Sequence, residues 1–205
     1  MPRRPRTSPR KKPRQGRSLA TVEIILDATA RVLCTIGYDR ASTNRIALAA
    51  GVSVGSLYQY FPSKEALVAA LAARHMASMT SLLRAKLSEV AKEPMPVAVR
   101  SIIQAMFDAH AVDPRLHKVL IEEVPRIGRL ENLRGVEKET ECLVQALLEA
   151  RRSELRRDNL ESMGFLLVTV VEAVTHAAVL AELEPARARS VVDELTDLVL
   201  RYLVA

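Results

Sequence analysis

The chain of 205 residues contains no tryptophan, only four tyrosines and three phenylalanines, and two cysteines. Because Cys34 and Cys142 lie far apart, the sequence excludes a disulfide framework and a zinc site with clustered ligands; reduced core thiols are the simplest interpretation, and a redox sensor is the alternative. No apolar run reaches the length of a membrane span, and no apolar segment directly follows the basic N-terminus as it would in a secretory signal. We therefore expect a cytoplasmic protein with no membrane span, metal or cofactor.

Acidic residues are absent from the first 17 positions, which contain eight of the chain's 30 lysines and arginines. The remaining residues carry 22 basic and 24 acidic side chains, so the net charge of +6 arises in this segment. Four interspersed prolines prevent a helix there, and we expect residues 1–17 to form a disordered basic arm. Such an arm either binds the phosphates or a groove of DNA or acts as a solubilising tail.

Apolar residues make up 49% of the chain and recur at helical spacing from residue 18 onward, without a β-hairpin signal or an internal repeat. Two prolines, at positions 94 and 96, mark the best internal boundary. The pattern predicts an all-α fold of about nine helices. They are expected over residues 19–36, 43–50, 54–60, 64–90, 97–111, from 114 to a break at 125, 131–156, 160–183 and 186–203.

Residues with strong preferences for helix ends define the first of these boundaries. Gly37 and Gly51 are expected to end their helices in the left-handed conformation. Ser42, Ser53 and Ser63 are expected to be N-caps of three successive helices, because a serine oxygen can accept a hydrogen bond from a free backbone N–H.

The stretch GVSVGSLYQYFPSKEAL, residues 51–67, holds three of the seven aromatic residues within four positions. Two short helices joined by a three-residue turn have the dimensions of a helix-turn-helix motif. On the second helix Leu57 and Phe61 share one face, which we expect to be buried. Tyr58 and Tyr60 cannot both join that face, so their hydroxyls are expected to point outward and to be available to a DNA phosphate.

The segment ASTNRIALAAGVSVGSLYQYFPSKEALVAAL, residues 41–71, resembles the DNA-binding signature of tetracycline-repressor-like transcriptional regulators, and the resemblance as a whole runs from about residue 22 to residue 71. The resemblance implies a homodimer with an N-terminal three-helix helix-turn-helix DNA-binding head and a larger C-terminal helical domain for ligand binding and dimerisation. After the basic arm at residues 1–17, it places the head at 18–64 and the effector-binding and dimerisation domain at 65–205.

The same resemblance assigns roles to residues of the head. Phosphate or DNA contacts are expected from Thr43, Ser56, Tyr58, Tyr60 and Lys64. Base edges would be faced by Val54, Gly55 and Gln59, of which Gln59 is suited to a pair of hydrogen bonds with adenine. Arg45 departs from the family pattern, which often has an acid there, and we expect it to add a phosphate contact.

The C-terminal region must dimerise if the head is to read a palindrome. The last two helices, about 160–183 and 186–203, are rich in apolar residues and are the expected interface, with a monomeric core as the alternative. The resemblance also implies a pocket for an apolar small-molecule effector. Its expected lining includes Met106, Phe107, His110 and Cys142.

The sequence therefore predicts a sequence-specific transcriptional regulator, most simply a repressor released from a palindromic operator in double-stranded DNA by a ligand. The alternatives are a nonspecific architectural DNA-binding protein that uses the basic arm, and a helical carrier or enzyme with a vestigial head. Catalysis is disfavoured because no nucleophile–base spacing, phosphate-binding loop or cluster of metal ligands is found in the sequence.

Overall fold

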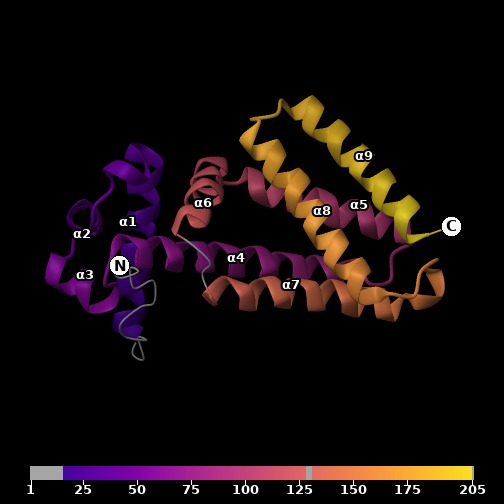
Figure 1. Ribbon diagram of the computed structural model, residues 1–205, viewed down its shortest axis with the longest axis horizontal. Coiled ribbons are helices and arrows are strands. Elements are labelled where there is room, and N and C mark those ends of the chain that lie inside the picture. The colour runs from indigo at the N-terminus through magenta and orange to yellow at the C-terminus, as the bar shows by residue number, and fades with distance from the viewer. Residues whose placement is uncertain (1–15, 128–130, 205) are drawn as a thin grey trace, which may run out of the picture. The chain divides into compact units, whose positions relative to one another are not determined.

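The computed structural model describes the backbone of residues 16–127 and 131–204, and over these residues the chain is helical without any strand (Figure 1). The predicted all-α fold is confirmed. The basic arm expected at residues 1–17 lies outside the described residues, apart from the backbone of its last two positions. The described helices are α1 Gly16–Arg40, α2 Thr43–Ala50, α3 Val54–Tyr60, α4 Lys64–Glu89, α5 Met95–Ala111, α6 Pro114–Ile127, α7 Glu131–Ala150, α8 Leu160–Leu180 and α9 Pro185–Leu203.

Local capping chemistry sets the ends of the short helices, as predicted. The hydroxyl oxygens of Ser42 and Ser53 accept hydrogen bonds from backbone N–H groups three residues later, at 3.3 and 3.1 Å. Ser63 does the same at the start of α4, at 3.2 Å. Gly51 ends α2 in the left-handed conformation, with φ 66° and ψ 28°. Helices α2 and α3 therefore have the bounds that the sequence predicts.

Longer helices depart from their predicted ends. Gly37 has a positive φ of 73°, but its ψ of 168° is not that of a left-handed cap, and helical turns continue to Arg40. Helix α6 runs to Ile127, past the break expected at Pro125. Helix α8 ends at Leu180 instead of 183, where Glu182 adopts a φ of 49° and the N–H of Leu183 reaches back to the carbonyl of Ala178.

Helix α7 ends at Ala150, six residues before the expected end. A single 3-10 turn, Arg152–Glu154, follows it. The side chain of Arg151, between the two, is buried and hydrogen-bonded to the backbone carbonyl of Glu93 at 2.8 Å. The helix expected to continue to residue 156 therefore ends where Arg151 makes a tertiary contact.

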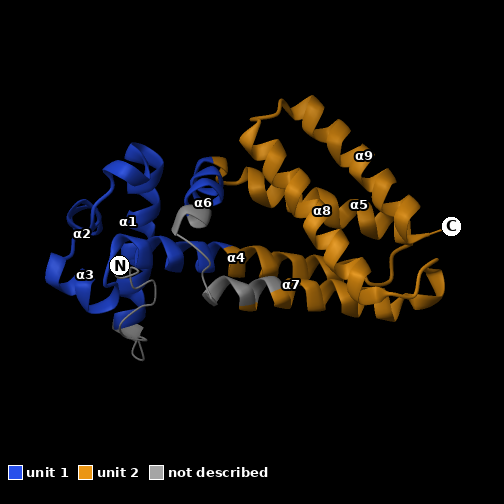
Figure 2. Cartoon of the chain, viewed as in Figure 1, with its two compact units in different colours: residues 1–75, 115–133 blue, residues 76–114, 134–205 orange. Residues whose placement is uncertain are grey.

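The chain forms two compact units (Figure 2). Residues 1–75 and 115–133 make up the first unit, and residues 76–114 and 134–205 make up the second. The division falls within α4, and most of α6 belongs to the first unit. The functional boundary expected between residues 64 and 65 stays a prediction.

Each unit has its own hydrophobic core. In the first unit Ile25, Leu33, Ile46, Leu57 and Phe61 are all less than 2% exposed, which confirms the predicted inward face of α3. In the second unit α5 packs against α8 and α9, and the core they share with α7 contains Met95, Ile103, Leu148, Met163 and Val192. Such apolar burial is the main source of the free energy of folding.

Two helices are long and apolar enough to cross a membrane by length and composition alone, namely Lys64–Glu89 and Leu160–Leu180. No such segment was expected from the sequence. The finding is weak evidence for a span, because a core helix of a water-soluble protein meets the same criterion. Only 17% of the most apolar stretch of Leu160–Leu180 is buried, so part of the apolar surface of this helix is not covered by the residues that the structure describes.

Candidate DNA-binding surface and effector cavity

Helices α2 and α3 are held together by small and branched apolar side chains. Ile46, Ala47 and Leu57 are each 0% exposed, and the small side chain of Ala47 allows the two helices to approach closely. The turn between them is closed by a backbone hydrogen bond from Val52 N–H to the carbonyl of Ala47, at 3.0 Å. This packing fixes the orientation of α3 relative to α2, as a helix-turn-helix motif requires.

The opposite side of α3 is open to solvent. Val54 is 37% exposed and Tyr58 39%, and both Gly55 and Gln59 are exposed as well. A Cβ atom added at Gly55 would meet only the Ser53 hydroxyl, at 3.9 Å, so no neighbour within the described chain requires a glycine there. The residues expected to face base edges thus share one accessible surface of α3.

Two of the expected phosphate donors contact each other. The hydroxyls of Thr43, at the start of α2, and Tyr58, on α3, are 3.0 Å apart. One hydroxyl donates to the other, which leaves the accepting hydroxyl's own proton available to an external acceptor. Ser56 forms a similar pair with Ser53, at 2.8 Å. These pairs restrict the rotation of the hydroxyl groups. Thr43, Ser56 and Tyr60 are each half-buried, so all three remain partly accessible to DNA.

Lys64 has partners that the sequence does not reveal. Its Nζ donates to the backbone carbonyl of Tyr38 at 2.8 Å and lies 3.8 Å from the centre of the Tyr38 ring. The Tyr38 hydroxyl in turn contacts Glu65 at 3.3 Å. Burial, followed by the nearby Glu65 carboxylate, raises the pKa of Tyr38 to about 12, so the phenol remains a hydrogen-bond donor. An ammonium has three N–H donors, so these contacts leave room for a phosphate.

Arg45 is exposed and donates from Nη1 to the carbonyl of Arg40, at 3.2 Å. Arg31, on α1, donates from Nη2 to the carbonyl of Ala49 near the end of α2, at 3.2 Å. Sequence reasoning missed Arg31 and Tyr38, because it assigned contacts only within the signature at residues 41–71. Together with Lys64 they tie α1 to the helices that follow it.

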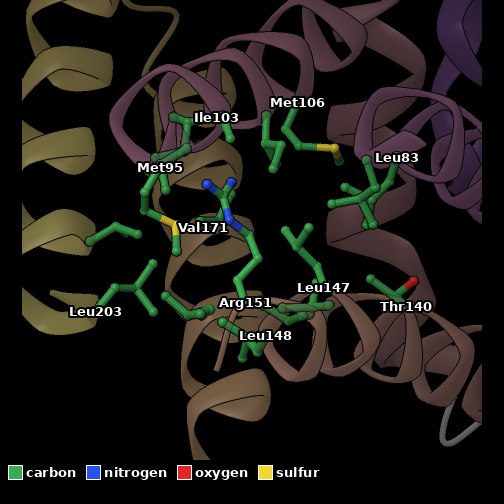
Figure 3. A pocket seen from close by; sticks show the side chains of 18 of the residues that line it. Leu83, Met95, Ile103, Met106, Thr140, Leu147, Leu148, Arg151, Val171 and Leu203 are labelled. Atoms are coloured by element: carbon green, nitrogen blue, oxygen red, sulfur yellow. The ribbon is translucent and has the colours of Figure 1, made fainter. Parts of the chain in front are cut away.

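The second unit contains an apolar cavity of about 100 Å³. Its lining comes from α4, α5, α7, α8 and α9, and all but three of the lining residues are apolar. The exceptions are Thr140, Arg151 and Glu172. Figure 3 shows the guanidinium group of Arg151 among the apolar side chains of this lining, near Met95 and Ile103.

The structure places the expected pocket residues in three different surroundings. Met106 lines the cavity. Phe107 and His110 lie on the same helix and are buried, but they are not among the lining residues. The His110 ring contacts the Met106 carbonyl at 2.6 Å, and burial lowers the pKa of His110 despite that contact. Cys142 is exposed and lines a separate, more polar depression.

Helix α8 carries exposed apolar side chains at helical spacing. Phe165 is 54% exposed, Leu166 43% and Leu180 38%, and Ala173 and Ala177 are exposed between them. On α9 Leu198 is 56% exposed. A stripe of this kind on a helix of a folded protein is typical of an interface.

Models of two protein families match the chain. "Bacterial regulatory proteins, tetR family" matches residues 25–71, and "Tetracyclin repressor-like, C-terminal domain" matches residues 94–203, more than half of the sequence. The first match includes the helix-turn-helix described above. The fold and this surface therefore define a helix-turn-helix regulator of transcription.

Individual relatives agree with these matches. The nucleoid occlusion factor SlmA of Glaesserella parasuis is 34% identical over 84 residues, which span 41% of this chain and only 40% of SlmA. The HTH-type transcriptional regulator BetI of Cronobacter sakazakii is 24% identical over 163 residues, 77% of this chain and 78% of BetI. The structure of SmeT, the repressor of a Stenotrophomonas maltophilia multidrug efflux pump, superposes with a TM-score of 0.67 over 92% of each chain, at 22% identity.

The chain belongs to the tetracycline-repressor family of transcriptional regulators. Regulators of this family bind DNA, act as dimers and are in general not enzymes. The resemblance inferred from residues 41–71 is thereby confirmed. The roles of individual residues in DNA and ligand binding stay predictions.

Proposed function

We propose that this protein is a cytoplasmic homodimeric repressor that binds a palindromic operator in double-stranded DNA and is released from it by a small-molecule effector. The observation that carries this proposal is the two-sided structure of α3. Leu57 is completely buried, while Val54, Gly55 and Gln59 form an accessible surface on the same short helix. A helix fixed on one side and open on the other is what major-groove reading requires.

The contacts divide into those that position the protein and those that read the sequence. Phosphates would be bound by side chains with hydroxyl, ammonium or guanidinium donors, namely Thr43, Arg45, Ser56, Tyr58, Tyr60 and Lys64. Gln59 has a carboxamide, which can donate to one atom of an adenine edge and accept from another. Val54 would contact a thymine methyl group.

Helix α4 is the expected path from effector to DNA. Its first turns supply the buried residues Leu67 and Leu71 to the first unit, and its second half supplies Leu83 and Leu87 to the cavity lining. An effector that favours one arrangement of the cavity would change the position of this helix and hence the spacing of two heads in a dimer. Release then follows from a shift in population between conformations that bind DNA and conformations that do not.

Titration of the dimer against a palindrome taken from beside its own gene, at several salt concentrations, tests this function. We expect saturable binding that is much tighter than binding to unrelated DNA. We further expect Gln59→Ala to remove the preference at one base-pair position in each half-site, at a cost of about 1–3 kcal/mol for the preferred base.

Lys64→Ala provides the comparison, since loss of a phosphate contact weakens binding to all sequences alike. Equal losses for Gln59→Ala across all variants of the site would contradict the base-reading role. Equal affinity of the wild-type protein for any DNA, lost on deletion of residues 1–17, would support the architectural alternative instead. Absence of DNA binding would leave the carrier or enzyme.

Gly55 allows a prediction in which stability and DNA binding change in opposite directions. Because no described neighbour obstructs a methyl group there, Gly55→Ala is expected to stabilise the fold by about 0.4–1 kcal/mol through the unfolded chain. The same methyl group would crowd the base edges and weaken operator binding by about 1–3 kcal/mol. Thermal melting and operator titration measure the two effects.

The matched control is Gly135→Ala on α7, where an added Cβ atom also meets none of the described residues within 4 Å. It should stabilise the protein similarly without a loss of operator affinity. Operator binding by Gly55→Ala that equals binding by the wild-type protein would mean that DNA does not approach this part of α3.

A further inference from the structure

The only cation that lines the effector cavity is incompletely paired within the described residues. Arg151 is 9% exposed. Its Nε and Nη2 donate to the Glu154 carboxylate at 2.8 and 3.1 Å, and Nη2 also donates to the Glu93 carbonyl at 2.8 Å. The remaining nitrogen, Nη1, is buried and has no hydrogen-bond partner among those residues.

An unpaired N–H group of a buried guanidinium is energetically unfavourable, because the group has lost its water without gaining an acceptor. Apolar side chains surround it: Met95, Ile103 and Leu148 line the same cavity (Figure 3). The cavity therefore offers an apolar volume for a ligand body and one strong donor for a ligand head group. Met95 and Met106 also line the cavity, and methionine side chains adapt readily to a ligand.

We infer that the effector is an amphipathic carboxylate, with an apolar chain in the cavity and a carboxylate oxygen bound to Nη1 of Arg151. A charged acceptor forms the stronger hydrogen bond with a guanidinium, particularly in apolar surroundings. Two acids lie near this site. Glu154, which is 42% exposed, accepts hydrogen bonds from Nε and Nη2 of Arg151 and leaves Nη1 unpaired, and Glu172 is one of the lining residues. The inference rests on the proposed function and specifies the chemistry of its ligand.

The volume of the cavity limits how much of a chain it can enclose. A cavity of about 150 Å³ is large enough for benzene, so a volume of about 100 Å³ holds about four carbon atoms beside the head group. The cavity is partly open, so the rest of a longer chain can extend beyond it, and decanoate is a suitable probe.

Calorimetric titration of the DNA-free, full-length dimer with three ten-carbon compounds tests the inference. Decanoate carries the anionic head group, decanol a neutral one and decyltrimethylammonium a cationic one. We expect decanoate to bind about ten- to hundredfold more tightly than decanol, as a charge-assisted hydrogen bond predicts, and the cation to bind most weakly. Equal or tighter binding of decanol would overturn the inference, and so would the absence of binding by decanoate.

Arg151→Gln should lower the affinity for decanoate about ten- to hundredfold, to the level of decanol, and change decanol binding by less than about twofold. Retained decanol binding shows that the cavity is intact in this variant. Arg152→Gln is the matched control, because Arg152 is half exposed and does not line the cavity. It should leave both affinities unchanged.

Unchanged decanoate binding in Arg151→Gln would overturn the inference. That result would mean that Nη1 binds something other than the carboxylate, such as a buried water. If that variant does not fold, the comparison of the three head groups on the wild-type protein still decides the question. None of these titrations contains DNA, so their failure is distinguishable from a failure of operator binding.

Discussion

Ala173→Arg is expected to convert the dimer into monomers and to lower the affinity for the palindromic operator at least about a hundredfold. Ala173 lies in the exposed stripe of α8, between Leu166 and Leu180, where a long cationic side chain would be buried without a partner on association. A monomer contacts one half-site only, whereas affinities of about 10⁻⁸–10⁻¹¹ M for a specific site require the full interface.

Light scattering coupled to size-exclusion chromatography measures the assembly, and titration with operator DNA measures the consequence. Ala146→Arg is the control, because Ala146 is also an exposed helical alanine but lies on α7, outside the expected interface. A dimer that persists in Ala173→Arg would place the interface elsewhere. Lost operator binding in an intact dimer would contradict the proposed dependence of operator affinity on dimerisation through α8.

Leu57→Ala is expected to destabilise the head by about 2–5 kcal/mol, the usual effect of removing a fully buried leucine side chain. Leu57 is 0% exposed and packs α3 onto the rest of the first unit. Leu48, on α2, is 83% exposed, so Leu48→Ala should change the free energy of unfolding by no more than about 0.5 kcal/mol.

Urea unfolding followed by circular dichroism compares the two variants, which differ in burial and not in the chemistry of the substitution. Operator binding should be lost in Leu57→Ala under conditions where the head is unfolded. Similar stabilities for the two variants would mean that α3 does not depend on this packing for its position.

The helix-turn-helix could be predicted to the residue because its signals are local. Ser42 and Ser53 accept hydrogen bonds from backbone N–H groups three residues later, and Gly51 donates to carbonyls three and four residues earlier. These effects are local, so they do not depend on the remainder of the fold. The inward face of α3 follows equally from the spacing of Leu57 and Phe61.

Other expectations failed or were incomplete where a distant segment decides the outcome. The position of the Lys64 ammonium group depends on Tyr38, 26 residues earlier. The ammonium donates to the Tyr38 backbone carbonyl and lies over the Tyr38 ring. The early end of α7 coincides with the contact between Arg151 and Glu93, 58 residues apart. Periodicity describes which residues can share a face of one helix, but not which neighbour that face meets.

The sequence by itself therefore determined the helices, the helix-turn-helix and the family, because caps, turns and a compact motif are encoded by adjacent residues. Only the tertiary structure decided the chemistry of the apolar cavity in the second unit. Five helices from distant parts of the chain line it, and the direction of each side chain depends on how its helix is rotated against the others. In the sequence Arg151 and Arg152 are neighbours of identical type, and packing alone buries the first and exposes the second.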